Sequence, residues 1–477
     1  MHRFHPSILR EYDIRGVVGQ TLGEADAWAV GLGFARILRA EAPARADGRH
    51  GVAVGRDGRL SSPALEAALV DGLVAGGVDV YRIGLAPTPM LYFAEASMQE
   101  VQGGIQVTGS HNPADHNGFK IVMGGRPFFG ADLHRLAVFA DRQGVGEGIG
   151  AAGGEGLGVV HQRELLELYV ERLLDGLDEG DMRRLAALRI GWDAGNAAAG
   201  PVVTRLTSAL PGQHFLLYCD VDGHFPNHHP DPTVEVNLAD LRSLVAANHL
   251  DFGVAFDGDA DRIGIVDALG RIVWGDQVLM LLAEDLLQRQ PGATILADVK
   301  ASQLVFDRIA ALGGRPVMCE TGHSLVKSRM KEIGAPLGGE MTGHIFFAEE
   351  WYGFDDAILT ALRVMRAVAP PARSLTQRRD SLPDMHATPE LRFAVSEARR
   401  AGVVAEVAAR LAAEGADVCT IDGVRVTNAD GWWLLRASNT QAMLTARAES
   451  PSAEGLARLL AALDAQLAAS GVARQGH

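Results

Sequence analysis

The sequence is poor in cysteine, and its acidic residues outnumber its basic ones. Its 477 residues include only Cys219, Cys319 and Cys419, which are widely separated. This predicts free thiols in a reducing compartment rather than a disulfide framework or a cysteine metal site. The first residues lack an apolar signal segment, and no apolar run is long enough to span a bilayer. We therefore expect a cytoplasmic protein without a membrane partner.

The charge balance limits the classes of ligand. Lysine and arginine number 44 against 59 aspartates and glutamates, which gives a formal net charge of -15. Such a surface disfavours nucleic acid as a partner, and an anionic substrate would require a locally basic site. A chain of this length, with 47% hydrophobic residues, is expected to form three or four domains with large cores.

Strand and helix alternate along most of the chain. Residues 51–55, 78–83 and 105–108 are predicted strands, and Ser62 is predicted to cap a helix over 62–75. Further strands are expected at 189–193, 215–218, 252–256, 294–297 and 316–319, with helices at 163–174, 277–288, 302–312 and 324–333. This alternation indicates α/β layers.

The pattern changes after about residue 385. A long helix is expected at 397–413, followed by short strands at 418–421, 432–436 and 443–448 and a final helix. Strands in close succession indicate an antiparallel α+β unit. The Gly- and Ala-rich residues 144–158 are predicted to be a linker.

A serine turn follows the strand predicted at 105–108. Residues 108–113 read Thr-Gly-Ser-His-Asn-Pro, and residues 117–120 read Asn-Gly-Phe-Lys. Ser110, in a tight glycine-containing turn, is placed as a covalent nucleophile requires. His111 and Lys120 are suited to moving a proton or neutralising a phosphate.

Three carboxylates follow another apolar strand. Asp257, Asp259 and Asp261 stand at alternate positions. These oxygen ligands suit a hard cation, Mg²⁺ or Ca²⁺. An EF-hand is not expected, since Arg262 and Ala268 occupy the places of its glycine and glutamate. Three carboxylates leave room for a phosphate oxygen, which favours Mg²⁺ in phosphoryl transfer.

Two later turns offer groups that suit a sugar phosphate. Residues 338–344 read Gly-Gly-Glu-Met-Thr-Gly-His, in which Glu340 and Thr342 suit hydroxyl recognition. Residues 436–440 read Arg-Ala-Ser-Asn-Thr, and an arginine with small donors suits a phosphate dianion. Each turn alone is also compatible with a purely structural role.

Five of these runs occur together in one order. They are Tyr-Asp-Ile-Arg-Gly, Thr-Gly-Ser-His-Asn-Pro, Asp-Gly-Asp-Ala-Asp-Arg, Gly-Glu-Met-Thr-Gly-His and Arg-Ala-Ser-Asn-Thr. In this the chain resembles the α-D-phosphohexomutases, and most closely the bacterial phosphomannomutase/phosphoglucomutase group. The resemblance covers essentially the whole chain.

The resemblance implies three related α/β domains plus a C-terminal α+β domain around a central active-site cleft. Expected are a phosphoserine-loop domain at 1–157, a metal-loop domain at 158–262, a sugar-loop domain at 263–370 and a phosphate-loop domain at 371–477.

The resemblance also implies roles for residues. Ser110 would be the phosphoserine, and one Mg²⁺ per active site would be held by Asp257, Asp259, Asp261 and the phosphate on Ser110. Lys120 is our first choice for proton transfer, and the other catalytic candidates are Arg15, His111, His323 and His344. Substrate contacts are expected from Tyr12, Arg262, Lys300, Glu340, Thr342, Arg436, Ser438, Asn439 and Thr440.

The implied reaction interconverts hexose 6-phosphate and hexose 1-phosphate, of mannose, glucose or both. Hexose 1,6-bisphosphate would be its intermediate and activator, and the protein would be a monomer or a homodimer. Met341 stands where phosphoglucosamine mutases tend to have Gln, which favours hexose over hexosamine phosphates. Phosphoglucosamine mutase is the alternative within the family. Gln441 and Ala442 replace the family's usual Glu-Pro, which predicts a looser phosphate turn. A phosphatase and a non-catalytic binding protein are the rival classes.

Overall fold

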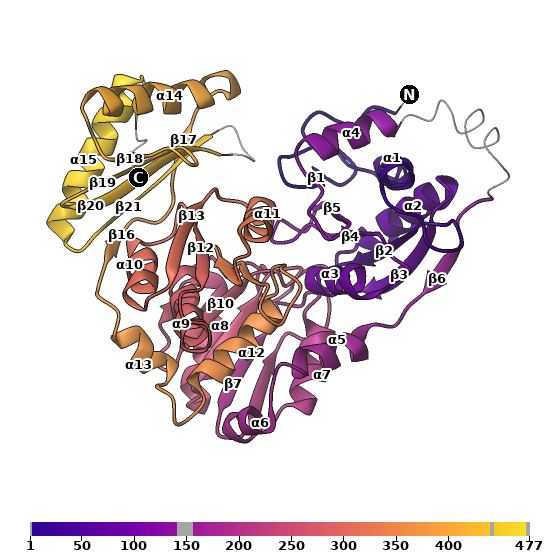
Figure 1. The fold of residues 1–477 in the computed structure, drawn as a ribbon, viewed down its shortest axis with the longest axis horizontal. Coiled ribbons are helices and arrows are strands. Elements are labelled where there is room, and N and C mark those ends of the chain that lie inside the picture. Colours follow the sequence, from indigo (N-terminus) through magenta and orange to yellow (C-terminus); the bar gives the residue numbers. More distant parts are fainter. Residues whose placement is uncertain (1, 141–155, 439–442, 474–477) are drawn as a thin grey trace.

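The computed structural model describes residues 2–140, 156–438 and 443–473. The described chain forms four sheets in sequence order. Figure 1 shows the N-terminal and C-terminal units on opposite sides of the molecule, with the two middle units between and below them. Among the described residues, no helix has the length and apolar character needed to cross a membrane.

The first sheet has six strands in the order β1-β5-β4-β2-β3-β6. Its strands are β1 (Ile14–Val17), β2 (Gly51–Arg56), β3 (Asp79–Leu85), β4 (Gly103–Val107), β5 (His116–Met123) and β6 (Val160–Gln162). Its helices are α1 (Glu24–Glu41), α2 (Ser62–Ala75), α3 (Thr88–Ser97) and α4 (Ala131–Phe139). β4, β2, β3 and β6 are parallel, whereas β5 and β1 are antiparallel to their neighbours.

The second sheet has the order β11-β10-β9-β7-β8. Its strands are β7 (Arg189–Asp193), β8 (Gln213–Leu217), β9 (Phe252–Phe256), β10 (Ile263–Asp267) and β11 (Ile272–Val273). Its helical segments are α5 (Leu166–Leu174), α6 (Glu179–Leu185), α7 (Gly200–Ala209), the 3-10 turn η1 (Glu235–Leu238) and α8 (Ala239–Asn248).

The third sheet has the order β13-β12-β14-β15. Its strands are β12 (Thr294–Asp298), β13 (Arg315–Cys319), β14 (Leu337–Gly339) and β15 (Ile345–Phe347). The helices here are α9 (Gly275–Arg289), α10 (Gln303–Ala311), α11 (His323–Ile333), α12 (Ala357–Val368) and α13 (Leu375–Asp380).

The three α/β units share one device. In each, a parallel strand turns back into an antiparallel neighbour, in the pairs β4–β5, β9–β10 and β14–β15. The turns between these pairs contain Ser110, the aspartates at 257–261 and Glu340 respectively. The predicted chemistry therefore lies at the carboxyl ends of parallel strands, where α/β sheets bind their ligands.

The C-terminal unit is antiparallel, which confirms the predicted change of class. Its strands are β16 (His386–Ala387), β17 (Leu391–Ala394), β18 (Val418–Cys419), β19 (Val424–Asn428), β20 (Gly431–Ala437) and β21 (Met443–Ser450). Its helices are α14 (Glu397–Ala413) and α15 (Ala453–Ala469). The fold class predicted from sequence, three α/β domains and a C-terminal α+β domain, is confirmed.

The apolar cores show which units are fused. One buried cluster runs through the first three units and includes Tyr92 and Phe93 of α3, Tyr169 of α5, and Trp351 and Phe354. The C-terminal unit has its own cluster, and a small one formed by Val299, Trp432 and Leu434 joins it to the third unit. The three α/β units are called domains I to III below, and the C-terminal unit is called domain IV. Domain IV is thus joined to the others by a much smaller apolar cluster than the one that domains I to III share.

One local prediction was wrong, and several strands were not predicted. Ser62 does not cap α2, because its hydroxyl donates to Asp57 Oδ1 at 2.5 Å and Ser61 occupies the cap position. β19 was missed, because its strand pattern directly follows the turn at Gly423. The domain boundaries stay predictions, and β6, β10 and β11 pair with the sheet that precedes each expected boundary.

Asp356 makes folding stability depend on pH. Its carboxyl caps α12 by accepting from Leu359 N at 2.9 Å and also accepts from Tyr169 Oη at 2.8 Å. Burial raises the pKa of this carboxyl to about 7. A raised acid pKa contributes stability that is present at low pH and is lost as the pH rises through about 7.

The loss of stability from low to neutral pH amounts to up to about 4 kcal/mol in the free energy of unfolding. We predict that Asp356→Asn, which has no carboxyl to ionise, removes this contribution to the pH dependence. Thermal melting from acid to neutral pH checks it: the variant should gain stability relative to the parent protein as the pH rises. A constant difference between the two proteins would contradict the assignment.

Candidate active site

Ser110 lies buried in a strained turn between β4 and β5. Its backbone has φ +48°, a left-handed conformation that is costly for a residue with a side chain. The turn is held by Thr108, whose Oγ1 accepts from Ser110 N at 2.8 Å. Ser110 Oγ donates to Asp257 Oδ2 at 2.8 Å and lies 3.1 Å from His111 Nδ1. The serine of domain I therefore faces the carboxylate loop of domain II.

Arg59 supports this turn, and the sequence analysis missed it. Its guanidinium donates to the carbonyl oxygens of Ser110 at 2.7 Å, Asn112 at 2.6 Å, Pro113 at 2.5 Å and His116 at 3.0 Å. The sequence does contain a pattern that could have indicated this role: within residues 55–62, the charged run Arg-Asp-Gly-Arg follows an apolar strand and precedes a helix.

Asp57 completes the support. Its Oδ2 accepts from Gly109 N at 3.1 Å and lies 3.2 Å from Arg59 Nε. A Cβ on Gly109 would lie 2.5 Å from the Arg59 guanidinium, so this position requires glycine. The side chains of Asp57 and Arg59 thus hold both edges of the turn that carries Ser110.

The three aspartates converge as predicted. Asp257, Asp259 and Asp261 are fully buried, and each offers an oxygen within 4.8 Å of the others. The Oδ1 atoms of Asp259 and Asp261 have no hydrogen-bond partner within the described parts of the chain. Orphaned buried carboxylate oxygens fit a hard cation, so this donor set suits Mg²⁺.

Lys120 is the cation that now faces these carboxylates. Its Nζ donates to Asp259 Oδ2 at 2.7 Å and to Asp261 Oδ2. Burial acts to lower the pKa of Lys120, but Asp259 and Asp261 outweigh burial and raise it. Burial, followed by repulsion from Asp259 and Asp261, raises the pKa of Asp257 well above its ordinary value. Lys120 alone therefore does not offset the charge of the loop.

A histidine network adjoins the carboxylates. His344 Nε2 accepts from Arg262 Nε at 2.8 Å, and its Nδ1 lies 2.8 Å from Asp355 Oδ2 and 3.7 Å from Asp261 Oδ1. Lys327 Nζ in turn donates to Asp355 Oδ1 at 2.8 Å. Arg262 and His344 are thus fixed beside the aspartates; neither Asp355 nor Lys327 was predicted.

The N-terminal loop connects domain I to domain III. Tyr12 Oη donates to Thr321 O at 2.7 Å, and the Tyr12 ring lies 6.1 Å from that of His323. His323 stacks on His344 with centroids 5.6 Å apart, and burial lowers its pKa well below the ordinary value. Arg15 Nε donates to Asp13 Oδ2 at 2.7 Å.

The turn that contains Glu340 and the strand end that contains Arg436 both approach residues 321–322, Arg436 through Asp422. Glu340 Oε1 accepts from Gly322 N at 2.6 Å, and Thr342 Oγ1 donates to Glu340 Oε2 at 3.4 Å. Arg436 is buried and donates through Nε to Asp422 Oδ2 at 3.0 Å.

Of the other residues predicted to bind substrate, Lys300 and Ser438 lie within the described chain, and Asn439 and Thr440 lie outside it. Lys300 is buried, and its carbonyl accepts from Arg447 Nη1 at 2.6 Å. Ser438 is buried beside the phosphate turn, whereas Asn439 and Thr440 lie outside the described residues.

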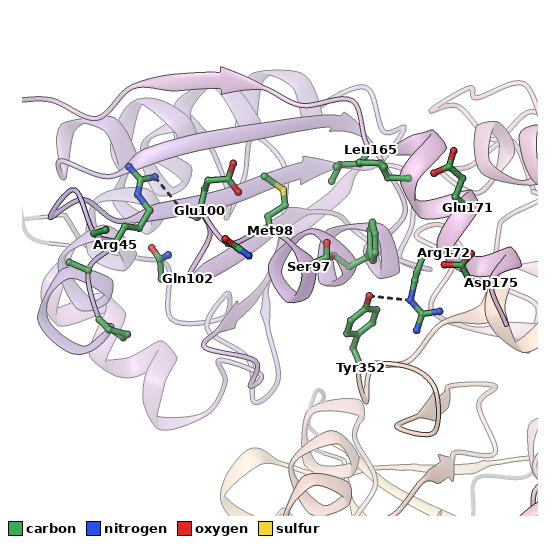
Figure 2. A pocket seen from close by; sticks show the side chains of 16 residues that line it. Arg45, Ser97, Met98, Glu100, Gln102, Leu165, Glu171, Arg172, Asp175 and Tyr352 are labelled. Atoms are coloured by element: carbon green, nitrogen blue, oxygen red, sulfur yellow. Dashed lines mark hydrogen bonds between the residues drawn. The ribbon is translucent and has the colours of Figure 1, made fainter.

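A surface pocket of about 1060 Å³ lies away from the interdomain site just described. It lies between α3 and α5, where Arg172 Nε donates to Tyr352 Oη at 3.2 Å (Figure 2). The residues that line it include none of the predicted site residues. The contacts from Ser110 through His344 and Tyr12 to Thr321 make the interdomain site the candidate.

Three α/β domains followed by this C-terminal domain define the phosphohexomutase class. The sequence matches phosphoglucomutase/phosphomannomutase alpha/beta/alpha domain I at residues 6–137, domain II at 167–270, domain III at 274–386 and the C-terminal domain at 390–466. The chain belongs to the phosphoglucomutase/phosphomannomutase family of the α-D-phosphohexomutase superfamily, which confirms the predicted resemblance. It is an isomerase that transfers a phosphoryl group within its substrate.

Relatives and solved structures agree. A phosphomannomutase/phosphoglucomutase of Pseudomonas aeruginosa is 42% identical over 464 residues, which are 97% of this chain and 96% of the relative. A phosphoglucomutase of Neisseria gonorrhoeae is 38% identical, with 95% of each chain covered. A crystal structure of a family protein from Burkholderia thailandensis is similar with a TM-score of 0.87, 40% identity and 98% of each chain covered.

Arg59→Lys tests the support of the serine turn. One ammonium cannot serve the four carbonyl oxygens that the guanidinium binds, although it keeps the charge. We expect kcat to fall by at least about tenfold while KM changes little, since a misplaced nucleophile affects the chemical step. Steady-state kinetics measures both constants.

The control is Arg82→Lys, which alters another domain I arginine, one that pairs with Glu66 at 2.9 Å. It should leave both constants unchanged. A folded Arg59→Lys variant with full kcat would show that the serine turn does not need this support.

Proposed function

We propose that the protein interconverts hexose 6-phosphate and hexose 1-phosphate, of mannose, glucose or both, and that Ser110 carries the phosphoryl group. The observation that carries the proposal is the Ser110 Oγ–Asp257 Oδ2 contact at 2.8 Å, because it sets a strained serine against a buried carboxylate cluster. A nucleophile at that position accepts and returns a phosphoryl group beside a cation site.

Asp257, Asp259 and Asp261 would hold one Mg²⁺ together with an oxygen of the Ser110 phosphate. The ion would neutralise negative charge on the phosphoryl group. The two orphaned oxygens of Asp259 and Asp261 support this assignment. Lys120 now donates to the Oδ2 atoms of Asp259 and Asp261. With the ion neutralising these carboxylates, Lys120 would be available to the substrate.

The transfer balances within the site. A sugar hydroxyl attacks phosphorus, and the bond between phosphorus and Ser110 Oγ breaks. The hydroxyl proton passes to a nearby base, which then returns a proton to the departing Ser110 oxygen. Hexose 1,6-bisphosphate results, turns around, and returns its other phosphoryl group to Ser110. Added hexose 1,6-bisphosphate would act as activator by phosphorylating a bare Ser110.

The identity of the base stays open among residues near Ser110. Lys120 is the first choice, although its raised pKa favours the protonated form in this state. His344, beside Asp355, and His323 are alternatives, and Arg15 and His111 would hold the phosphoryl oxygens.

Recognition is assigned to the remaining turns. Glu340 and Thr342 would bind sugar hydroxyls, and Tyr12, Arg262 and Lys300 would line the path between the loops. Arg436, Ser438, Asn439 and Thr440 would bind the phosphate that does not react. Met341 favours hexose over glucosamine phosphates, and the relatives bear names of glucose and mannose enzymes. Phosphoglucosamine mutase is the less supported alternative.

Further features belong to the same proposal. The boundaries at 157, 262 and 370 would separate the four domains, and the protein would act as a monomer or homodimer. Three free cysteines support a reducing, cytoplasmic location.

Ser110→Ala should lower turnover by at least about 1000-fold, because it removes the hydroxyl that faces Asp257 and would carry the phosphoryl group. Binding of hexose phosphate should persist, since the contacts of Glu340 and Arg436 are untouched. A coupled isomerisation assay and calorimetric binding measure the two effects.

Ser243→Ala is the matched control, as the hydroxyl of this serine donates to Ala239 O at 2.9 Å within α8, away from the serine turn. It should behave as the parent protein does. Full isomerisation by Ser110→Ala would overturn the proposal, and net release of phosphate by the parent protein would favour a phosphatase.

A further inference from the structure

Asp422 joins two domains at the phosphate turn. It lies between β18 and β19 of domain IV, and its side chain is 14% exposed. Its Oδ2 accepts from Arg436 Nε at 3.0 Å, lies 2.8 Å from Arg436 Nη2, and accepts from Thr321 N of domain III at 3.1 Å. One carboxylate oxygen thus receives groups from both domains.

Asp422 contacts one edge of the Arg436 guanidinium, and no contact of its other edge is seen among residues 2–140, 156–438 and 443–473. A guanidinium has five N–H donors in one plane, and Asp422 engages the edge formed by Nε and Nη2. The edge that includes Nη1 is the one that a phosphate can bind with two parallel hydrogen bonds. Asp422 therefore sets the plane in which Arg436 presents that edge.

The contact with Thr321 reaches the rest of the site. Thr321 O accepts from Tyr12 Oη at 2.7 Å, and Thr321 Oγ1 donates to Asp298 Oδ2 at 3.1 Å. Asp298 Oδ1 in turn accepts from Met341 N at 3.3 Å. Thr321 is therefore a shared point of the loops of domains I, III and IV.

The contact between Asp422 and Thr321 is one of several polar contacts that attach domain IV to domain III. The other polar contacts between domains III and IV include Arg425, which donates to Val299 O at 2.6 Å, and Arg447, which donates to Lys300 O at 2.6 Å. These bind the segment after β12, whereas Asp422 binds the segment after β13. Because the shared apolar cluster is small, polar contacts such as these make up much of the attachment of domain IV to domain III.

We propose that Asp422 is a positioning residue that aligns Arg436 for the non-reacting phosphate and closes domain IV onto Thr321 while the bisphosphorylated sugar turns around. The inference rests on the proposed function. It follows that Asp422 helps to retain the bisphosphorylated sugar. Without Asp422, hexose 1,6-bisphosphate should leave the site more often before the second transfer.

The test is Asp422→Asn, which keeps an acceptor oxygen but removes the charge. We expect KM for hexose 1-phosphate to rise by about tenfold, and more bisphosphate to escape per turnover. Release of labelled bisphosphate from enzyme labelled on Ser110 measures the escape. The activator concentration needed for half-maximal rate should rise in parallel.

Asp430→Asn is the matched control. Asp430 lies in the next turn of domain IV and pairs with Arg458 Nε at 2.9 Å on the surface. This variant should match the parent protein in KM and in escape.

A double-mutant cycle separates positioning from general destabilisation. If Asp422 acts through Arg436, its effect on KM should largely vanish in an Arg436→Lys background. Full additivity, or parental KM and escape in Asp422→Asn, would overturn the inference. Failure of the parent protein to take phosphate on Ser110 would instead overturn the proposed function.

Discussion

The rest of the site depends on the burial of three carboxylates opposite one lysine. Asp257, Asp259 and Asp261 end a fully buried strand, and only Lys120 among nearby cations donates directly to them within the described chain. Such an arrangement is costly unless more positive charge is supplied. This excess of negative charge suits a cation at the domain interface, as the proposed function requires.

The four-domain fold serves to bring turns from separate sheets together. Each α/β sheet sends one hairpin turn toward the same region, and the turns approach very closely. A Cβ on Gly258 would lie 2.2 Å from Ser110 O, so the aspartate turn and the serine turn approach each other closely through their backbones. The first three domains share a core and hold these two turns rigidly. Domain IV, with a separate core, brings Arg436 through polar contacts.

Local patterns in the sequence predict the elements and most of the site. The strands before Ser110 and Asp257 were predicted because an apolar run and a polar turn are both short-range signals. Arg59 and Asp422 were not, because their partners lie 51 and 101 residues away along the chain. Asp355 was missed for a different reason: it is near His344 along the chain, but only the backbone bridge between Phe346 and Asp355 places its carboxylate against the histidine ring. Resemblance to the family supplied roles, whereas the structure supplied the side chains that hold them.

The central claim is that Ser110 is a reversible phosphoryl carrier, and intact-mass measurement tests it most directly. After incubation with hexose 1,6-bisphosphate, the protein should gain the mass of one phosphoryl group. Peptide mapping should place that group on Ser110, and excess hexose monophosphate should remove it. A protein that never gains this mass, or that carries it on another residue, would contradict the account.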